Sequence, residues 1–155
     1  MEQILHGERI AKLGKVALGC CAVIFDESKQ KVLLTRRTDN NRWCLPGGHV
    51  QPGESVTETC LRKVNVETGL NVRIVRLIGV YSDPHRLIEY GDGNRFHLIS
   101  LSFEAEPVGG TLALTDEITA YDYFSHNEVE NIDLMDHHVE RLDDAFATCS
   151  TTYIR

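Results

Sequence analysis

The stretch GHVQPGESVTETCLRKVNVETGL, residues 48–70, places side chains that could do chemistry at regular spacing. Positions 63, 66 and 67 are spaced i, i+3 and i+4, so on a helix they share one face. Three carboxylates there would bind Mg²⁺ or Mn²⁺, hard cations that prefer oxygen ligands and pair with diphosphate oxygens. This chain instead has Lys63, Val66 and a single carboxylate, Glu67. The pattern has the frame of a metal site in which two ligands are replaced.

The two replacements predict a weak metal site. Val66 removes an oxygen donor, and Lys63 exchanges attraction for repulsion. At an effective dielectric constant of about 20, unit charges roughly 4 Å apart interact by about 4 kcal/mol, and a divalent ion doubles that energy. This is an upper bound, because the long lysine stem can carry its ammonium group into water. We therefore expect a Mg²⁺ or Mn²⁺ ion that is weakly held or arrives with the phosphates of a substrate.

The same stretch resembles the Nudix box, the family signature G-x5-E-x7-R-E-U-x-E-E-x-G-U, in which U is aliphatic. Lys63 and Val66 stand where the signature has glutamates. Outside the box, WCLPGG at 43–48 is similar to the family's W-x-LPGG entry and KVLLTRR at 31–37 to its preceding strand. The matching positions of the box are Gly48, Glu54, Arg62, Val64, Glu67, Gly69 and Leu70.

The resemblance implies roles for particular residues. Glu67 is the surviving ligand of the box, and the carbonyl of Gly47 is implied as a second ligand. The segment EPVGGTLALTDEITAYDYF is similar to the one that brings a late glutamate to the site, which makes Glu117 a candidate base or extra ligand. A solvated loop acid beside Asp116 is the alternative for Glu117. The resemblance also gives structural roles to Gly48, Glu54, Arg62 and Gly69, with Arg62 and Glu54 tying the helix to the loop or forming only an exposed ion pair of little energy.

Several arginines could bind a phosphate. Arg36 and Arg37 end the strand at 31–37, where alternation predicts that only one of them faces the site, and Arg86 follows an SDP turn. The ammonium group of Lys63 could also contact the diphosphate directly. Pro84 lies near the position where ADP-ribose hydrolases of the Nudix family often carry a proline, which gives a weak preference for ADP-ribose. The aromatic residues available to stack on a base are Trp43, Tyr81 and Phe96, for the last two of which core packing is the stronger reading.

The elements that must position these residues follow from periodicity and turn signals. Ser55 and Glu58 form a capping box that starts a helix, and Gly69 stops it. Residues 3–13 have the spacing of a short amphipathic helix. Residues 16–25 and 31–37 form two apolar runs around DESKQ, which predicts a hairpin. Further strands are expected at 71–81, 95–107 and 118–124, and a helix at 134–147. The interleaving predicts an α/β/α sandwich with a mixed β-sheet, the Nudix fold.

Composition limits the classes of function. A chain of 155 residues is expected to be one domain, with an N-terminal segment at 1–14, the box at 48–70 and a C-terminal helix at 134–147. The net charge of −7 argues against a nucleic acid polymer as partner. No run of about 18 apolar residues predicts a membrane span, and the N-terminus lacks the apolar core of a secretory signal. We therefore expect a cytoplasmic protein.

The cysteines and the adjacent histidines give weaker signals. Five cysteines, an odd number without a CxxC pair, indicate reduced thiols, and Cys60 is expected to be a core thiol. His137 and His138 invite a metal reading, but adjacent residues point to different sides of a helix. A packing stripe through Leu134, His138, Leu142 and Phe146 is favoured instead.

Together these features predict a hydrolase that cleaves the diphosphate of a small nucleoside diphosphate derivative, at reduced activity. A catalytically impaired module that binds nucleotides on the same scaffold is the main alternative. A third interpretation is an interaction protein, such as a homodimer through the N-terminal segment, with no ligand of its own.

Overall fold

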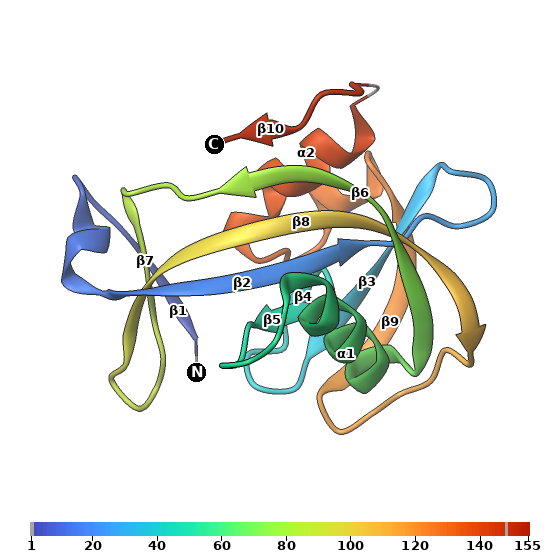
Figure 1. Ribbon diagram of the computed structural model, residues 1–155, viewed down its shortest axis with the longest axis horizontal. Helices are drawn as coiled ribbons and strands as arrows, with labels where there is room; N and C mark the ends of the chain where they lie inside the picture. The colour runs from blue at the N-terminus through green and yellow to red at the C-terminus, as the bar shows by residue number, and fades with distance from the viewer. Residues whose placement is uncertain (1, 148) are drawn as a thin grey trace.

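The computed structural model describes residues 2–147 and 149–155, which form two β-sheets and two α-helices (Figure 1). The helices are α1 (Val56–Thr68) and α2 (Val139–Phe146), and three short 3₁₀ helices are η1 (Ile10–Leu13), η2 (Glu128–Asn131) and η3 (Asp136–His138). The strands are β1 (Gln3–His6), β2 (Lys15–Val23), β3 (Lys31–Arg37), β4 (Trp43–Cys44), β5 (Gly47–His49), β6 (Leu70–Tyr81), β7 (Arg86–Glu89), β8 (Arg95–Gly110), β9 (Ile118–Ser125) and β10 (Tyr153–Ile154).

The larger sheet is mixed, as expected. Its strands follow the order β1-β7-β8-β2-β5, and β6 pairs with β8 and with β10. The pairs β2–β8 and β6–β10 are parallel, and the other pairs are antiparallel. A smaller antiparallel sheet has the order β4-β3-β9. The parallel register of β2 on β8 puts the strand that precedes the hairpin turn in the middle of the larger sheet.

The two faces of β2 bury two separate cores. Cys20 and Ala22 pack with α1, whose buried residues include Val64. Cys21 and Val23 point the other way and pack with Leu142 of α2. This alternation follows from the period of two along a strand. Figure 1 shows α1 and α2 on opposite sides of the sheet, the α/β/α arrangement that the sequence predicts.

The predicted hairpin at 16–37 is only partly correct. The turn forms, and Leu33 N–H donates to the Ile24 carbonyl at 2.9 Å. Beyond this point the two strands separate, because both edges of β2 are occupied by β8 and β5, whereas β3 pairs with β4 and β9. The strands therefore belong to different sheets. β2 is part of the larger sheet, and β3 is part of the smaller one.

The helix predicted at residues 3–13 is wrong. β1 instead extends along β7, from the pair Gln3–Glu89 to the pair His6–Arg86, and only Ile10–Leu13 form a single 3₁₀ turn. Pairing with a sheet edge supplies hydrogen bonds that local helical spacing cannot anticipate. Arg9 also has a left-handed backbone, with φ of 46°, which interrupts a regular helix.

The C-terminal helix is shorter than the predicted range 134–147. Residues just before η3 pair with Trp43, whose N–H donates to the Asp133 carbonyl and whose carbonyl accepts from Met135 N–H, each at 2.9 Å. These bonds hold the chain extended, so α2 begins only at Val139. The predicted packing stripe is confirmed: His138 and Leu142 are buried, and Leu134 and Phe146 pack against the same core.

The box helix α1 begins and ends where the sequence predicts. Ser55 Oγ accepts from Glu58 N–H at 3.1 Å, and Gly69 adopts a left-handed backbone with φ of 79° and donates to the Asn65 carbonyl. Such a residue past the helix end favours glycine, which has no Cβ to clash. Among the described residues, no helix is long and apolar enough to cross a membrane. The five cysteines are all free, and Cys60 is fully buried in the core.

Two valines on α1 provide a matched test of this packing. Val64 is fully buried, whereas Val66 is 42% exposed. We expect Val64→Ala to lower the free energy of unfolding by about 2 kcal/mol, because it removes two buried methyl groups and leaves a cavity. Val66→Ala should change it by no more than about 0.5 kcal/mol. Urea unfolding of both variants measures the difference, and the helix propensity change is the same in each. Equal effects would contradict the described orientation of α1.

Candidate active site

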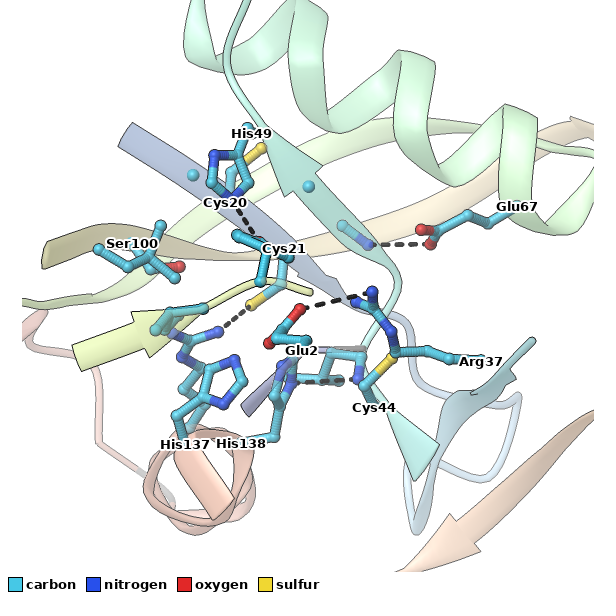
Figure 2. Close-up of a pocket in the computed structure, with 18 residues that line it drawn as sticks. Glu2, Cys20, Cys21, Arg37, Cys44, His49, Glu67, Ser100, His137 and His138 are labelled. Carbon is cyan, nitrogen blue, oxygen red and sulfur yellow. Dashed lines mark hydrogen bonds and ion pairs between the residues drawn. The ribbon is translucent and has the colours of Figure 1, made fainter. Parts of the chain in front are cut away.

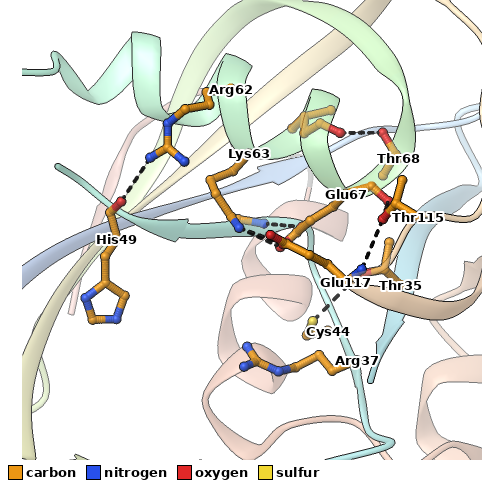
Figure 3. Close-up of polar contacts among 12 residues, drawn as sticks. Thr35, Arg37, Cys44, His49, Arg62, Lys63, Glu67, Thr68, Thr115 and Glu117 are labelled. Atoms are coloured by element: carbon orange, nitrogen blue, oxygen red, sulfur yellow. Dashed lines mark hydrogen bonds and ion pairs between the residues drawn. The ribbon is translucent and has the colours of Figure 1, made fainter. Parts of the chain in front are cut away.

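A cavity of about 450 Å³ lies along the face of α1 that carries the box residues. Its walls come from the ends of β3 and β5, the turn that follows β5, and the loop between β8 and β9. Figure 3 shows the polar residues that meet there. The lining residues are Thr35, Arg37, Thr38, Asp39, Gly47, Gly48, His49, Gln51, Arg62, Lys63, Glu67, Tyr90, Asp116, Glu117 and Ile118.

Lys63 turns its ammonium group into this cavity instead of out to water. Nζ lies 2.8 Å from Glu117 Oε2 and 3.5 Å from Glu67 Oε1 (Figure 3). The lysine stem passes over Gly48, where a Cβ would lie 2.7 Å from Lys63 Cε. Only 16% of the lysine side chain is exposed. The sequence left open that the Lys63 ammonium group extends into water. In the structure it lies instead between the carboxylates of Glu67 and Glu117.

Glu67 is fixed from the other side by the backbone of β5. Its Oε2 accepts from Gly47 N–H at 3.0 Å. Burial raises the pKa of the Glu67 carboxyl to about 7, although the Lys63 ammonium and the Gly47 N–H both act to lower it. At Gly47, β5 lies so close to β2 that a Cβ would be 2.2 Å from the Cys20 carbonyl oxygen. Glycine, which has no Cβ, allows the two strands to lie this close.

Glu117 reaches the same point from a loop that is docked against α1. The Glu117 carbonyl accepts from Thr38 Oγ1 at 2.9 Å, and Glu117 N–H donates to Thr115 Oγ1 at 3.3 Å. Thr115 Oγ1 in turn donates to the Glu67 carbonyl at 3.2 Å. These bonds join the loop to the C-terminal end of the helix. Glu117 is thus an element of the cavity and not a loop acid surrounded only by solvent.

Arg62 and Glu54 tie the helix to the preceding loop. Arg62 Nε donates to Glu54 Oε1 at 2.5 Å, and Arg62 Nη2 donates to Glu54 Oε2 at 3.0 Å. Glu54 Oε2 also accepts from Thr59 Oγ1 and from Gln51 N–H. The hydrogen bonds from Arg62, followed by those from Thr59 and Gln51, lower the pKa of Glu54 to about 2. This bidentate pair anchors the box turn, in keeping with a structural role.

The residues of this cavity do not fit a divalent ion held by the protein alone. No group of three or more His, Cys, Asp and Glu side chains in the described part of the chain is arranged to hold a metal. The two candidate carboxylates already share the Lys63 ammonium. Val66 is exposed and does not line the cavity. Positions 63 and 67 therefore meet as their spacing predicts, whereas position 66 stays at the rim of that helix face.

The two arginines at the end of β3 point in different directions, as alternation predicts. Arg37 lines the cavity, where it donates to both carboxylate oxygens of Asp39 and lies 3.4 Å from Glu2. Arg36 instead donates to Thr119 Oγ1 at 3.1 Å on the far side of the strand. Arg37 is the member of the pair that faces the site.

Other candidates for substrate binding lie outside this cavity. Trp43 packs edge-on against Phe124 in the core below α2, with ring centres 4.9 Å apart. Arg86 pairs with Glu140 at 3.1 Å. Tyr81 is buried, with its hydroxyl donating to Asp144 at 2.8 Å.

Two aromatic residues that sequence reasoning missed do line the cavity. The rings of His49 and Tyr90 lie 5.9 Å apart, and their Nε2 and hydroxyl atoms share a hydrogen bond of 2.9 Å. Phe96, for which the sequence favours packing over stacking on a base, packs against both rings. The place of His49 immediately after the glycine pair was the available signal. Tyr90 lies far away in sequence and gave none.

Comparison with known proteins places the chain in a family. The NUDIX domain model matches residues 15–146. An ADP-ribose pyrophosphatase of Methanocaldococcus jannaschii is 35% identical over 109 residues, 68% of this chain and 61% of that protein. A MutT-like protein of Streptomyces ambofaciens is 33% identical over 99 residues, 64% of this chain and 58% of that protein. The chain thus matches about three fifths of the length of these relatives.

Solved structures share the fold. An ADP-ribose pyrophosphatase from Streptococcus suis has a TM-score of 0.71 at 22% identity and covers 90% of this chain and 98% of that one. A UDP-X diphosphatase has a TM-score of 0.73 at 20% identity and covers 92% of this chain and 68% of that one. The family match extends from the start of β2 to the end of α2, and on this evidence the chain belongs to the Nudix family.

Proposed function

We propose that this chain hydrolyses the diphosphate of a small nucleoside diphosphate derivative, slowly, with Mg²⁺ or Mn²⁺ arriving on the substrate phosphates. The names of the relatives, ADP-ribose pyrophosphatase among them, support the reaction class and a weak preference for an ADP-ribose-like substrate. The expectation of low activity rests on one observation: the Lys63 ammonium lies between Glu67 and Glu117, on the helix face where a bridging cation would be needed.

The residues of the cavity suit an anionic ligand and a proton transfer. Lys63 and Arg37 present positive charge to the space where a diphosphate would lie. A carboxyl with a pKa of about 7 is close to evenly divided between its two protonation states near neutral pH, so Glu67 can accept a proton from an attacking water. Glu117, more exposed, is the second candidate base. Both roles are proposals for this chain.

The position of the Lys63 ammonium group also supports a second function. Lys63 can balance the charge of a diphosphate, but it cannot acidify a bound water as a divalent ion does. A protein with such an internal cation would bind a nucleotide and turn it over poorly or not at all. We therefore keep a nucleotide-binding module on the Nudix scaffold as the alternative. A cytoplasmic location and a homodimer stay predictions from the sequence.

Restoring the signature residues tests the metal-site account. Lys63→Glu/Val66→Glu should raise turnover of ADP-ribose and related nucleoside diphosphates with Mg²⁺ or Mn²⁺. It should also tighten metal binding by about 10² or more, because repulsion of a few kcal/mol is removed. Lys63→Glu alone should give most of the gain, since Val66 does not line the cavity. Mononucleotide release and metal titration measure the two effects.

The matched control for this reversal is Lys31→Glu. Lys31 pairs with Glu128, away from the box helix. Lys31→Glu makes the same change of charge as Lys63→Glu alone, and Lys31 does not line the cavity, so turnover and metal binding should stay as in the wild type. Unchanged turnover and metal affinity in the box variants would remove the metal-site account.

Binding without added metal separates the two proposed functions. With EDTA present, the wild type should still bind ADP, because the Lys63 ammonium supplies a positive charge in the cavity. Lys63→Gln should weaken this binding about tenfold, equivalent to about 1.4 kcal/mol. Isothermal titration calorimetry measures both affinities, with Lys31→Gln as the control. Binding in EDTA together with no turnover when metal is supplied would support the binding module; no binding in EDTA would count against it.

The pKa of Glu67 predicts a pH dependence of stability. The folded value of about 7 lies above the ordinary value of 4.5. The stability that the neutral carboxyl contributes is therefore complete below about pH 4.5 and is lost as the pH rises through about 7. Glu67→Gln does not titrate, so its free energy of unfolding relative to the wild type should increase between about pH 5 and pH 8. Urea unfolding at both pH values measures this change, and a difference independent of pH would contradict the raised pKa.

A further inference from the structure

Three buried side-chain nitrogens in the described part of the chain have no hydrogen-bond partner: Arg86 Nε, His137 Nδ1 and Arg141 Nε. All three residues line one small cavity of about 20 Å³, together with Tyr81, Asp83, Ile88 and Leu98. Leaving a buried polar group without a hydrogen-bond partner is unfavourable. Three such groups gathered around one space indicate that a partner with hydrogen-bonding atoms belongs there.

A second cavity, of about 60 Å³, lies next to this space on the side of the box helix. The two cavities share Ile88, Leu98, His137 and Arg141. The larger cavity in turn shares Arg37, Gly47, Gly48, His49, Glu67 and Tyr90 with the cleft at the box. Figure 2 shows His137 and His138 from the segment before α2, facing Glu2 and Arg37 across this space. The cavities at Arg141 and the cleft at the box are therefore neighbours that share walls.

Arg141 is the unusual member of the group. Only 4% of the residue is exposed, and no carboxylate of the described residues forms an ion pair with its guanidinium group. Its recorded contacts are weak ones: Nη1 to Cys21 Sγ at 3.9 Å, and the ring of Tyr81 at 5.5 Å. Leaving a charge buried without a counterion is strongly unfavourable. Glu2 lines the same cavity and interacts electrostatically with Arg141, but no described carboxylate lies within ion-pair distance of the guanidinium group, which leaves it able to bind an added anion.

The neighbouring acids are already paired with other arginines. Glu140 and Asp83 lie 3.1 and 3.6 Å from the terminal nitrogens of Arg86. Glu2, which lines the larger cavity, forms its ion pair with Arg37 at 3.4 Å. Arg86 keeps its Nε unpaired despite these contacts. The innermost space thus offers two arginine donors and one imidazole nitrogen.

The donors and the volume define the ligand. Arginine nitrogens only donate, and the guanidinium group matches the paired oxygens of a carboxylate or phosphate. At about 10–15 Å³ for each water-sized sphere, the cavity of about 60 Å³ holds about four to six, which is the size of such a group and too small for a nucleoside. We propose that the cavity at Arg141 binds a small oxyanion, a phosphate or carboxylate, either free or as the acidic end of a nucleotide derivative. The second source rests on the proposed function, whereas the first does not.

Inorganic phosphate is the direct probe. The imidazole resonances of His137, assigned with a His137→Gln variant, should shift and saturate as phosphate is added to the full chain at millimolar concentration. Arg141→Gln should weaken this binding at least tenfold. Arg95→Gln should leave it unchanged, because Arg95 is partly exposed, pairs with Glu89 and does not line the cavity. Arg141→Lys, which keeps the positive charge, provides a second variant should the glutamine protein not fold.

Two outcomes decide the proposal. Saturable shifts that depend on the charge at position 141 support it. His137 resonances that do not respond to phosphate in the wild type, at any concentration up to about a hundred millimolar, mean that the cavity holds only water and overturn it. This result needs no variant, so a folding defect cannot obscure it.

A matched pair of nucleotides distinguishes the two sources. UDP-glucose and UDP-glucuronate differ only in the group at the end of the sugar, a hydroxymethyl or a carboxylate. If the anion is the acidic end of a nucleotide derivative, UDP-glucuronate should bind at least tenfold more tightly, and Arg141→Gln should abolish the difference. Equal binding assigns the site to a free anion. Failure of both nucleotides to bind, with phosphate still bound at His137, counts against the proposed function for uridine nucleotides and leaves the oxyanion site in place.

Discussion

The ion pairs of Lys63 with Glu67 and Glu117 are the interaction on which the box cavity depends. One ammonium group lies 2.8 Å from one carboxylate and 3.5 Å from the other, and only 16% of the lysine side chain is exposed. Without that charge, Glu67 and Glu117 would face each other across a cavity that already disfavours charge on Glu67. A divalent ion would solve the same problem of repulsion. The lysine therefore balances the charge of the two carboxylates as a metal cation would. It does not acidify a bound water as a divalent ion does.

Local signals predict the part of the site that local structure builds. The capping residue Ser55 and the stop at Gly69 give the bounds of α1, and helical spacing then places Lys63 beside Glu67. The contact with Glu117 followed from resemblance to a family and not from spacing. Val66 shows the limit of the helical argument: i, i+3 and i+4 positions share a face about 100° or more wide, and a residue at its margin can be exposed.

Features that depend on distant pairing could not be read from the sequence. Residues 3–6 have no local reason to be extended, and β1 exists because the edge of β7 is available to it. That strand brings Glu2 next to Arg37, thirty-five positions away in the chain. The cavity at Arg141 arises in the same way, from β6, β7, β8, η3 and α2. Arg141, taken singly, reads as an ordinary surface arginine, whereas Arg86 was already a candidate to bind a phosphate.

Arg37 lines both the cleft at the box helix and the neighbouring cavity of about 60 Å³. Its guanidinium group pairs with Asp39, which lines the cleft, and with Glu2, which lines the cavity of about 60 Å³. A diphosphate in the cleft would compete with Asp39 for this guanidinium group, and an anion farther in would repel the carboxylate of Glu2. Burial raises the pKa of Glu2, so this acid can become neutral more readily than an exposed one. A ligand with negative charge at both ends would thus meet Arg37 and Arg141, and the Glu2 carboxyl that lines the same cavity can become neutral.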